Sequence, residues 1–461
     1  MKRTEIKQLL TQPYTEGSVY VAGWIRTARQ SSKVGFIELN DGSQFGNLQI
    51  VYDKDLANFN EINKLGLSAA IEVWGEVVLT PEMKQPLEIR ATKIEVMGDS
   101  AKDYPLQKKR HSLEYLRTQL TLRPRTNTFM AVFRVRSVLS MAIHQFFQDR
   151  GFVYVHTPIL TSADAEGAGE MFQVTSLDLN DLPMTEDGRV DYSKELFGKK
   201  MGLTVSGQLA VEPFALSFSK VYTFGPTFRA ENSNTVRHAN EFWMIEPEIS
   251  FCDLDCMMDI IEEMVKYLID YVLEQAPQEM QFFNDRIDNS LLERLEVVRQ
   301  SRFARISYTE AIELLQASGK SFEFKPVWGQ EIQTEHEKYL AGEYFKQPVF
   351  VTDYPTDAKA FYMKLSDDGK TVRACDLLVP AIGEIVGGSQ REDDFERLKA
   401  EMERRGMPTK EYQWYLDLRR YGSAVHSGFG LGFDRIIQYL TGIANIRDVQ
   451  AYPRTPHNAE H

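Results

Sequence analysis

The segment that most constrains this chain is a polar loop set between two β-rich runs, residues 220–224 and 241–245. Apolar and aromatic residues dominate both runs, which predicts a strand, a long loop and a returning strand. The loop carries two arginines, a histidine and an acid: Arg229, Arg237, His238 and Glu231. Guanidinium forks match phosphate oxygens, so we predict that the loop holds a polyphosphate, with Phe242 flat beneath a base. A hairpin with a solvated tip is the alternative.

Further strand-like runs in the second half of the chain follow one another with little helix between them. They are residues 348–355, 360–363, 375–380 and 382–391. This order predicts a large antiparallel sheet and not a doubly wound one. The sequence contains neither a GxxxxGK[ST] loop nor a strand–GxGxxG–helix unit, so side chains and strand ends must hold any nucleotide. Apolar residues at helical spacing predict flanking helices over residues 127–150 and 254–273, and the expected fold class is α+β.

Residues 17–98 form a smaller unit of five strand-like runs punctuated by glycines. The runs are residues 19–26, 36–40, 47–52, 70–79 and 87–96, with a helical insert at 56–65. Five short strands with one helix predict an OB-type β-barrel, a fold that often binds single-stranded nucleic acid. Phe36 and Gln49 lie on runs that can face a binding surface, where an aromatic ring stacks on a base and an amide reads its edge. Packing of both residues in a small core is the alternative.

The chain is therefore predicted to contain an N-terminal barrel domain (residues 1–100), a linker (101–126) and a large sheet domain (127–461). Two segments are predicted to interrupt the large domain: a polar surface insertion near 178–200 and a mainly helical insertion near 274–346. The linker is basic at residues 108–110, which suits either a solvated hinge or contact with a phosphate backbone.

Composition excludes several classes of protein. The net charge of −13 argues against indiscriminate nucleic-acid binding, although it allows a local basic surface. Three cysteines are too few for a disulfide framework, and the spacing of Cys252 and Cys256 predicts unpaired residues in a helical core and a reducing compartment. No stretch resembles a signal peptide or is long and apolar enough to span a membrane. We therefore expect a cytoplasmic protein that does not engage a membrane.

Two acids lie on neighbouring strand-like runs, Asp376 and Glu384. Carboxylates beside a phosphate site usually hold magnesium, which prefers oxygen ligands. Charge on an edge strand is the alternative, but Glu384 lies in an apolar, glycine-rich run, where an unpartnered acid is costly. Residues 428–437 form a glycine-rich strand that leads into a helix, with Arg435 in the first turn.

Taken together, these segments resemble the class II aminoacyl-tRNA synthetases of the aspartate, asparagine and lysine subgroup. The predicted helix and strand that end at Pro158 resemble motif one, residues 228–242 resemble motif two, and residues 428–435 resemble motif three. The match spans nearly the whole chain, from the barrel through the hinge to the three motifs in order. The resemblance implies a barrel that binds the anticodon and a catalytic domain that forms an aminoacyl-adenylate from ATP.

Within the subgroup the chain most resembles the asparagine enzymes. Residues 205–212 read VSGQLAVE, and Val211 occupies the place where aspartate enzymes have a lysine for the substrate carboxylate. The insertion at 178–200 and the runs 231–235 and 243–248 also follow the asparagine pattern. One departure is minor: Ala239-Asn240 stands where Leu-Ala is more usual.

The resemblance implies a role for each candidate residue. Arg229 would hold the α-phosphate of ATP and the amino-acid carboxylate, and Arg435 and His238 would hold the outer phosphates, while Arg237 is left for the tRNA acceptor end or solvent. Phe242 would stack under adenine, and Asp376 and Glu384 would hold Mg²⁺. The substrate ammonium group would be bound by two residues: Glu166 and Gln208.

Side-chain selection is implied to rest on Arg391, which can donate to an amide oxygen or to a carboxylate. It cannot choose asparagine over aspartate alone, so an acceptor for the amide NH₂ is needed. Glu231 is the candidate, because a buried acid there would repel an aspartate side chain. In the barrel, the resemblance implies that Phe36 stacks on the central anticodon base and that Gln49 reads its edge.

The expected partners are L-asparagine, tRNA(Asn) and a second copy of the chain bound through motif one. Three rival interpretations stay open: an aspartyl enzyme that charges both tRNAs, a paralogue that has lost tRNA charging, and a nucleic-acid-binding module. Val211 argues against the first and the barrel against the second. The third would not need Asp376, Glu384 and Arg435 together.

Overall fold

The computed structural model describes residues 2–11, 16–83, 85–165 and 171–461. The chain divides into two compact units, residues 1–134 together with His461 and residues 135–460. Each unit is described by itself below.

The first unit is built on the predicted β-barrel. Its strands are β1 (Ser18–Gln30), β2 (Val34–Asn40), β3 (Leu48–Asp53), β4 (Ala70–Leu79) and β5 (Leu87–Gly98). They close in the order β1-β2-β3-β5-β4, and β3 and β5 pair in parallel while the other pairs are antiparallel. Alternate residues such as Ile37, Ile50, Ile71 and Val73 are fully buried, as a strand with one face in the core requires. The predicted barrel is confirmed.

Short helices accompany the barrel. They are α1 (Ile6–Thr11), α2 (Phe59–Ile62), α3 (Leu113–Arg117) and the 3₁₀ turn η1 (Arg123–Arg125). Residues 101–126, predicted as a linker, therefore contain helical turns and belong to the first unit. They also contain Arg123, which is fully buried with its guanidinium 4.2 Å from the ring centre of Phe129.

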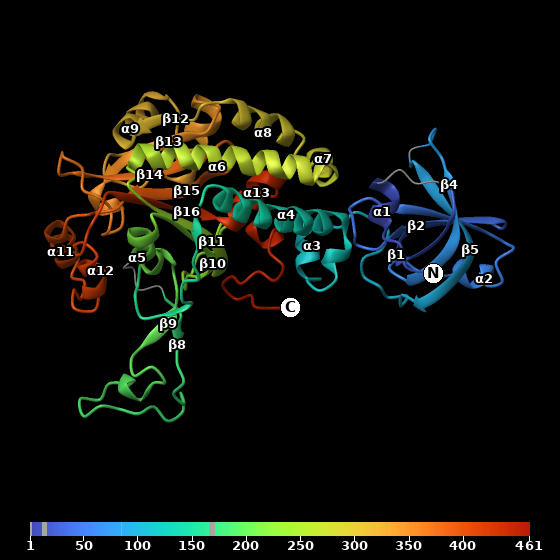
Figure 1. Ribbon diagram of the computed structural model, residues 1–461, viewed down its shortest axis with the longest axis horizontal. Coiled ribbons are helices and arrows are strands. Elements are labelled where there is room, and N and C mark those ends of the chain that lie inside the picture. Colours follow the sequence, from blue (N-terminus) through green and yellow to red (C-terminus); the bar gives the residue numbers. More distant parts are fainter. Residues whose placement is uncertain (1, 12–15, 84, 166–170) are drawn as a thin grey trace. The chain divides into compact units, whose positions relative to one another are not determined.

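The second unit is organised by an eight-stranded sheet in the order β12-β13-β14-β15-β16-β11-β10-β6 (Figure 1). Its strands are β6 (Val153–Tyr154), β10 (Lys220–Phe228), β11 (Glu241–Ser250), β12 (Ala304–Ser307), β13 (Val349–Pro355), β14 (Thr371–Val379), β15 (Gly383–Gln390) and β16 (His426–Gly432). The pairs β6–β10 and β12–β13 are parallel and all the others are antiparallel. The predicted large antiparallel sheet is thus confirmed, with a parallel pair at each edge.

The second unit also contains longer helices, some of which pack on this sheet and others on neighbouring helices. The longer ones are α4 (Asn127–Asp149), α5 (Gln208–Phe218), α6 (Leu254–Gln275), α7 (Pro277–Arg286), α8 (Leu291–Gln300), α9 (Tyr308–Ala317), α11 (Phe395–Arg404) and α13 (Phe433–Thr441). Helix α6 packs on β14 and β16, and α5 packs on β10 and β11. Helices α4 and α6 touch through Phe146 and Tyr267, whose ring centres are 5.4 Å apart.

The remaining elements are short. They are α10 (Thr334–Lys338), the π-helical turn η3 (Tyr339–Tyr344), α12 (Gln413–Asp417) and the 3₁₀ turns η2 (Tyr192–Lys194), η4 (Thr356–Ala358) and η5 (Ile446–Asp448). A small sheet of β7 (Leu160–Thr161), β9 (Met201–Leu203) and β8 (Gln173–Val174) stands at the base of residues 175–200, which extend away from the body of the unit (Figure 1).

Two predictions of local structure are wrong. Residues 360–363 form a turn with a single bridge from Met363 to Arg391, because this turn lies over the cleft and not in the sheet. Cys252 and Cys256 are joined in a disulfide, since Cys252 precedes α6 and its Cα comes within 5.4 Å of that of Cys256. The predicted insertion at 274–346 is mainly helical, and it also contains β12, an edge strand of the main sheet.

Candidate active site

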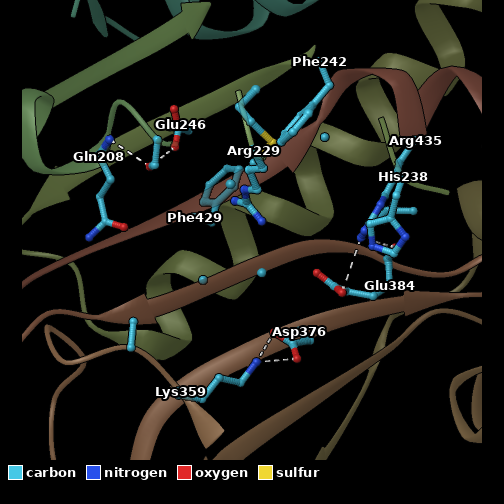
Figure 2. A pocket seen from close by; sticks show the side chains of 18 of the residues that line it. Gln208, Arg229, His238, Phe242, Glu246, Lys359, Asp376, Glu384, Phe429 and Arg435 are labelled. Carbon is cyan, nitrogen blue, oxygen red and sulfur yellow. Dashed lines mark hydrogen bonds and ion pairs between the residues drawn. The ribbon is translucent and has the colours of Figure 1, made fainter. Parts of the chain in front are cut away.

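A cleft of about 490 Å³ opens over the middle of the large sheet. Its walls come from the hairpin β10–β11, from β14, β15 and β16, and from the first turn of α13. Figure 2 shows Gln208 and Glu246 at one end, Arg229 near Phe429 in the middle, and His238, Arg435 and Glu384 at the other end. The cleft is therefore polar at both ends and has aromatic side chains between them.

The hairpin β10–β11 positions the middle of the cleft. Its register is unbroken from Lys220↔Ile249 to Phe228↔Glu241, so Arg229 emerges directly beyond the last pair. Asn240 holds this point, because its Nδ2 donates to the carbonyls of Arg229 at 2.8 Å and Glu231 at 2.9 Å. The guanidinium of Arg229 lies 5.4 Å from the ring centre of Phe242. The arginine and the aromatic ring predicted from the sequence are thus brought together.

A cluster of charge forms the second end of the cleft. The Arg435 Nη1 atom, in the first turn of α13, is 3.4 Å from Glu384 Oε2. Burial lowers the pKa of His238, and the nearby cations of Arg435, Arg237 and Arg229 lower it further. Glu384 opposes this effect. Burial alone would raise the pKa of Glu384, but Arg435 and the other nearby cations hold it below its usual value. The geometry brings two basic side chains and a carboxylate together in a space open to a ligand.

The two predicted metal-binding acids converge. The Oδ1 of Asp376 and the Oε1 of Glu384 lie 3.3 and 3.5 Å from the position that a Cβ on Gly387 would occupy. Lys359 Nζ donates to both oxygens of Asp376, at 2.8 and 2.6 Å (Figure 2). Burial keeps the pKa of Asp376 above its ordinary value although Lys359 opposes the shift, and Glu384 adds repulsion. The cation that pairs with Asp376 in this structure is therefore the ammonium group of Lys359, a residue that was not predicted from the sequence.

The other end of the cleft is a turn that presents Gln208. Glu246, on β11, accepts hydrogen bonds from Ser206 Oγ and from the Gly207 amide at 2.9 Å. Ser206 Oγ in turn accepts from the Gln208 amide at 3.1 Å. Gln208 Nε2 is buried and has no hydrogen-bond partner among the residues that the structure describes. An orphaned buried donor at the cleft indicates a ligand with an acceptor atom.

Arg391 is nearly buried at 3% exposure and bounds the cleft next to this turn. Its Nε and Nη2 donate to the two oxygens of Glu248, which is fully buried on β11, and its Nη1 donates to Ser389 Oγ at 2.7 Å. Glu248 raises the pKa of Arg391, so the guanidinium stays charged in spite of its burial. The buried carboxylate beside Arg391 is therefore Glu248. Glu231, predicted for this place, is only half-buried in the loop after β10.

A second layer of buried charge supports the first. Glu212, on α5, accepts from Arg419 Nη2 at 2.5 Å, from Tyr415 Oη at 2.6 Å and from His426 Nε2 at 2.7 Å. The Nδ1 of His426 faces the Ala424 carbonyl at 2.7 Å. Both ring nitrogens thus face acceptors. Burial would raise the pKa of Glu212, but Arg419 and His426 hold it well below its usual range.

The other predicted site residues have different surroundings. Glu166 lies outside the described residues. Arg237 is not left for solvent, because its Nη1 is 3.0 Å from the carboxylate of Glu337. In the first unit, the ring of Phe36 is 41% exposed on β2, and Gln49 Nε2 donates to Glu88 Oε2 at 2.8 Å.

Comparison with known proteins agrees with this geometry. The family of tRNA synthetases class II (D, K and N) matches residues 112–456, and the OB-fold nucleic acid binding domain matches residues 19–97. The asparagine–tRNA ligases of Acetivibrio thermocellus and Clostridium tetani are 60% and 59% identical to the chain, over 100% of both sequences.

Solved structures give the same result. The asparaginyl-tRNA synthetase of Pyrococcus horikoshii, complexed with asparaginyl-adenylate, superposes with a TM-score of 0.87 at 33% identity over 99% of both chains. The enzyme of Entamoeba histolytica in complex with asparaginyl-adenylate gives 0.82 at 26% identity over 96% of both. In the part of the chain that is described, no helix has the length and apolar character needed to cross a membrane.

The fold and the cleft are those of a class II aminoacyl-tRNA synthetase. Within that class the chain belongs to the asparagine–tRNA ligases, as the full-length identity near 60% establishes.

The buried layer around Glu212 makes a prediction about stability. In Glu212→Gln, the cation of Arg419 loses its buried counter-charge, and we expect unfolding to become easier by about 3 kcal/mol. Urea denaturation at pH 7 measures this change. Because the pKa of Glu212 is lowered on folding, its contribution is full above the unfolded pKa and is lost as the pH falls through the folded one. The difference between wild type and variant should therefore shrink under strongly acidic conditions, and a constant difference would contradict the assignment.

Proposed function

We infer that the chain ligates L-asparagine to tRNA(Asn) in two steps. First, the asparagine α-carboxylate attacks the α-phosphorus of ATP, which gives asparaginyl-adenylate and pyrophosphate. Next, the hydroxyl of the 3′-terminal adenosine of the tRNA attacks the mixed anhydride, which gives asparaginyl-tRNA and AMP. The observation that carries this inference is the cleft itself, with the orphaned amide of Gln208 at one end and the basic cluster of His238 and Arg435 at the other.

The attacking carboxylate is already a nucleophile, so the first step needs no side-chain base. Positioning and charge neutralisation carry most of the rate. Arg229, between the two ends of the cleft, holds the substrate carboxylate and the α-phosphate together. Phe242, at 5.4 Å from the Arg229 guanidinium, stacks under the adenine. Arg435 and His238 hold the β- and γ-phosphates that leave.

Gln208 and Glu166 bind the ammonium group of asparagine. For Gln208 the support is its cleft position and the rigid turn that Glu246 fixes through Ser206 and Gly207. For Glu166 the support is the resemblance of the sequence alone. The side-chain oxygen of Gln208 can accept a hydrogen bond from the substrate ammonium group, while its Nε2 donates to the substrate carboxylate.

Asp376 and Glu384 are proposed to hold Mg²⁺. Their oxygens converge over Gly387, and a pair of carboxylates that leaves positions for phosphate oxygens suits this ion. Among the residues described, no group of three or more histidine, cysteine or acidic side chains is placed to hold a metal ion. Phosphate oxygens would therefore complete the coordination that the two carboxylates begin. When bound, Mg²⁺ would neutralise charge on the pyrophosphate, and Lys359 would release Asp376 for this purpose.

The barrel is proposed to bind the anticodon. The exposed ring of Phe36 offers a stacking surface, and its cross-strand neighbour on β1 is Arg29. Gln49 lies on the adjacent strand β3, in register with Glu38 on one side and Glu88 on the other. A base stacked on Phe36 would have its edge within reach of an amide on the neighbouring strand.

A homodimer through motif one is also proposed. The support is that β6 is a sheet edge with two exposed apolar side chains, Val153 at 41% and Tyr154 at 37%. An exposed apolar edge strand commonly pairs with another chain. A cytoplasmic location follows from the reaction, because tRNA is charged where translation takes place.

Discrimination between asparagine and aspartate is proposed to rest on the pair Arg391–Glu248. Glu248 already neutralises Arg391, so the pair offers hydrogen bonds without net charge to the substrate side chain. The neutral amide of asparagine fits such a surface. The carboxylate of aspartate would be a second anion beside an arginine that Glu248 already neutralises, and Glu248 would repel it.

The proposed function is tested by ATP–pyrophosphate exchange. Exchange should require L-asparagine, and L-aspartate at the same concentration should give a rate lower by at least about 100-fold. Charging of purified tRNA(Asn) should follow the same amino-acid preference. Exchange that depends on aspartate would overturn the assignment in favour of an aspartate enzyme.

The source of discrimination is tested with Glu248→Gln. Loss of this charge leaves Arg391 as a free cation at the substrate side chain, so kcat/KM for aspartate in the exchange reaction should rise relative to asparagine by about tenfold or more. Asp288→Asn, which removes an ion-paired carboxylate that does not line the cleft, is the control and should leave the preference unchanged. Glu231→Gln should have a smaller effect than Glu248→Gln, and the reverse order would return the role to Glu231.

A pH dependence follows from His238. Its lowered pKa leaves the ring neutral in the free enzyme at neutral pH, and the negative triphosphate would raise that pKa on binding. ATP should therefore bind with uptake of a proton, and affinity should increase as the pH falls from 8 towards 6. Calorimetry in two buffers of different ionisation enthalpy measures the uptake. His238→Gln corrects for the titration of ATP itself, and equal proton uptake in both proteins would exclude His238.

A further inference from the structure

Arg237 lines the cleft, and its guanidinium is bound by the helical insertion. Its Nη1 donates to Glu337 Oε2 at 3.0 Å and to the Ile382 carbonyl at 2.9 Å, and its Nη2 donates to Thr334 Oγ1 at 2.6 Å. The side chains of Arg237 and Glu337 are 15% and 9% exposed, so this ion pair is well shielded from solvent. The tip of the loop between β10 and β11 is thereby fastened to helix α10.

Glu337 makes a second contact, to the strand that carries a proposed metal ligand. The amide of Glu384 donates to Glu337 Oε2 at 3.3 Å. Gly383, just before it, has a φ of +94°, and a Cβ added there would lie 2.3 Å from the same oxygen. The carboxylate is thus packed directly on the backbone at the start of β15. One oxygen atom ties α10, the loop tip and β15 together.

The loop tip carries His238 and β15 carries Glu384, and these are the two groups proposed to face the triphosphate. His238 follows Arg237 in the chain, and Thr235 Oγ1 bonds both to His238 Nδ1 at 2.5 Å and to the Arg237 amide at 3.2 Å. Glu384 is the residue whose amide Glu337 holds. A shift of the Glu337 carboxylate would therefore move His238 and Glu384 relative to each other.

We propose that Glu337 is a positioning residue for ATP, which sets the distance between His238 and Glu384 by holding the Arg237 guanidinium at the wall of the cleft. The proposal rests on the ATP roles given above to His238 and Glu384. Glu337 itself does not line the cleft, so it acts through Arg237 and the backbone of β15. Helix α10 runs directly into the π-helical turn η3, an irregularity that is frequent at functional sites.

Glu337→Gln tests the proposal, because the amide keeps the shape and removes the charge that holds Arg237. We expect KM for ATP in the exchange reaction to rise about tenfold, with KM for asparagine changed less than about twofold. The Kd for ATP, measured by calorimetry without asparagine, should rise by the same factor. A purely structural role would move both substrates together.

Two further variants separate the ion pair from general damage. Arg237→Gln should reproduce the change in Kd for ATP, and the double variant should be no weaker than either single one, as for two residues that act as a unit. Gly383→Ala should displace the carboxylate and give the same selective effect. Gly369→Ala is its control, since Gly369 also has a positive φ of +66° but has no atom near its Cβ position.

Asp288→Asn is the control for loss of a shielded ion pair in the insertion. The Asp288–Arg294 pair is 2.7 Å long with side chains 25% and 13% exposed, and neither residue lines the cleft. This variant should leave Kd for ATP unchanged. Equal changes for ATP and asparagine in Glu337→Gln, or additive effects of Arg237→Gln and Glu337→Gln, would overturn the proposal. If the wild type binds ATP but shows no asparagine-dependent exchange, the proposed function is overturned instead. The role of Glu337 can still be judged in that case, because the ATP titrations compare the variants without the exchange reaction.

Discussion

The bidentate ion pair between Glu248 and Arg391 is the interaction on which the active-site end of the sheet depends. Glu248 on β11 and Ser389 on β15 lie on either side of Gly428 on β16. A Cβ on Gly428 would lie 2.1 Å from the Glu248 carboxylate, so the missing side chain gives that carboxylate its path across the sheet. The pair, the strand order and the glycine at the centre therefore require one another.

Such a pair is not a simple source of stability, because taking two charges out of water costs much of what their attraction returns. Its value here is in orientation. Glu248 and Ser389 engage three nitrogen atoms of Arg391, which leaves the guanidinium little freedom to follow a ligand. The layer behind it, around Glu212, holds α5 against the segment that leads into β16 through Arg419 and His426. The proposed side-chain selection thus rests on a guanidinium whose orientation is fixed by its buried neighbours.

Local sequence predicted the parts of the site that depend on neighbours along the chain. Arg229 and Phe242 sit at the ends of one hairpin and Arg435 follows one strand, so strand–loop patterns and the motif resemblance placed them together. The barrel and the antiparallel sheet were predicted for the same reason. Glu248, Lys359 and Glu337 were missed as site residues because their partners are Arg391, Asp376 and Arg237, 143, 17 and 100 residues away. Nothing in the runs that contain them indicates which cation each will meet.

Asn240 shows how the same limit affects the interpretation of a substitution. By sequence it is a minor departure from the usual Leu-Ala, yet its side chain bonds to the carbonyls of Arg229 and Glu231 and its amide donates to the Arg454 carbonyl at 2.8 Å. The base of the loop is thus held by the side chain of Asn240, the residue before β11, and the tip is held by Glu337 from the insertion. A loop fixed at both ends presents Arg229 and His238 at a set separation, as their proposed binding of the triphosphate requires. Under the proposed ATP roles, the position of this loop depends on Glu337 and the Arg454 carbonyl, which lie outside the three motifs, as well as on Asn240 within motif two.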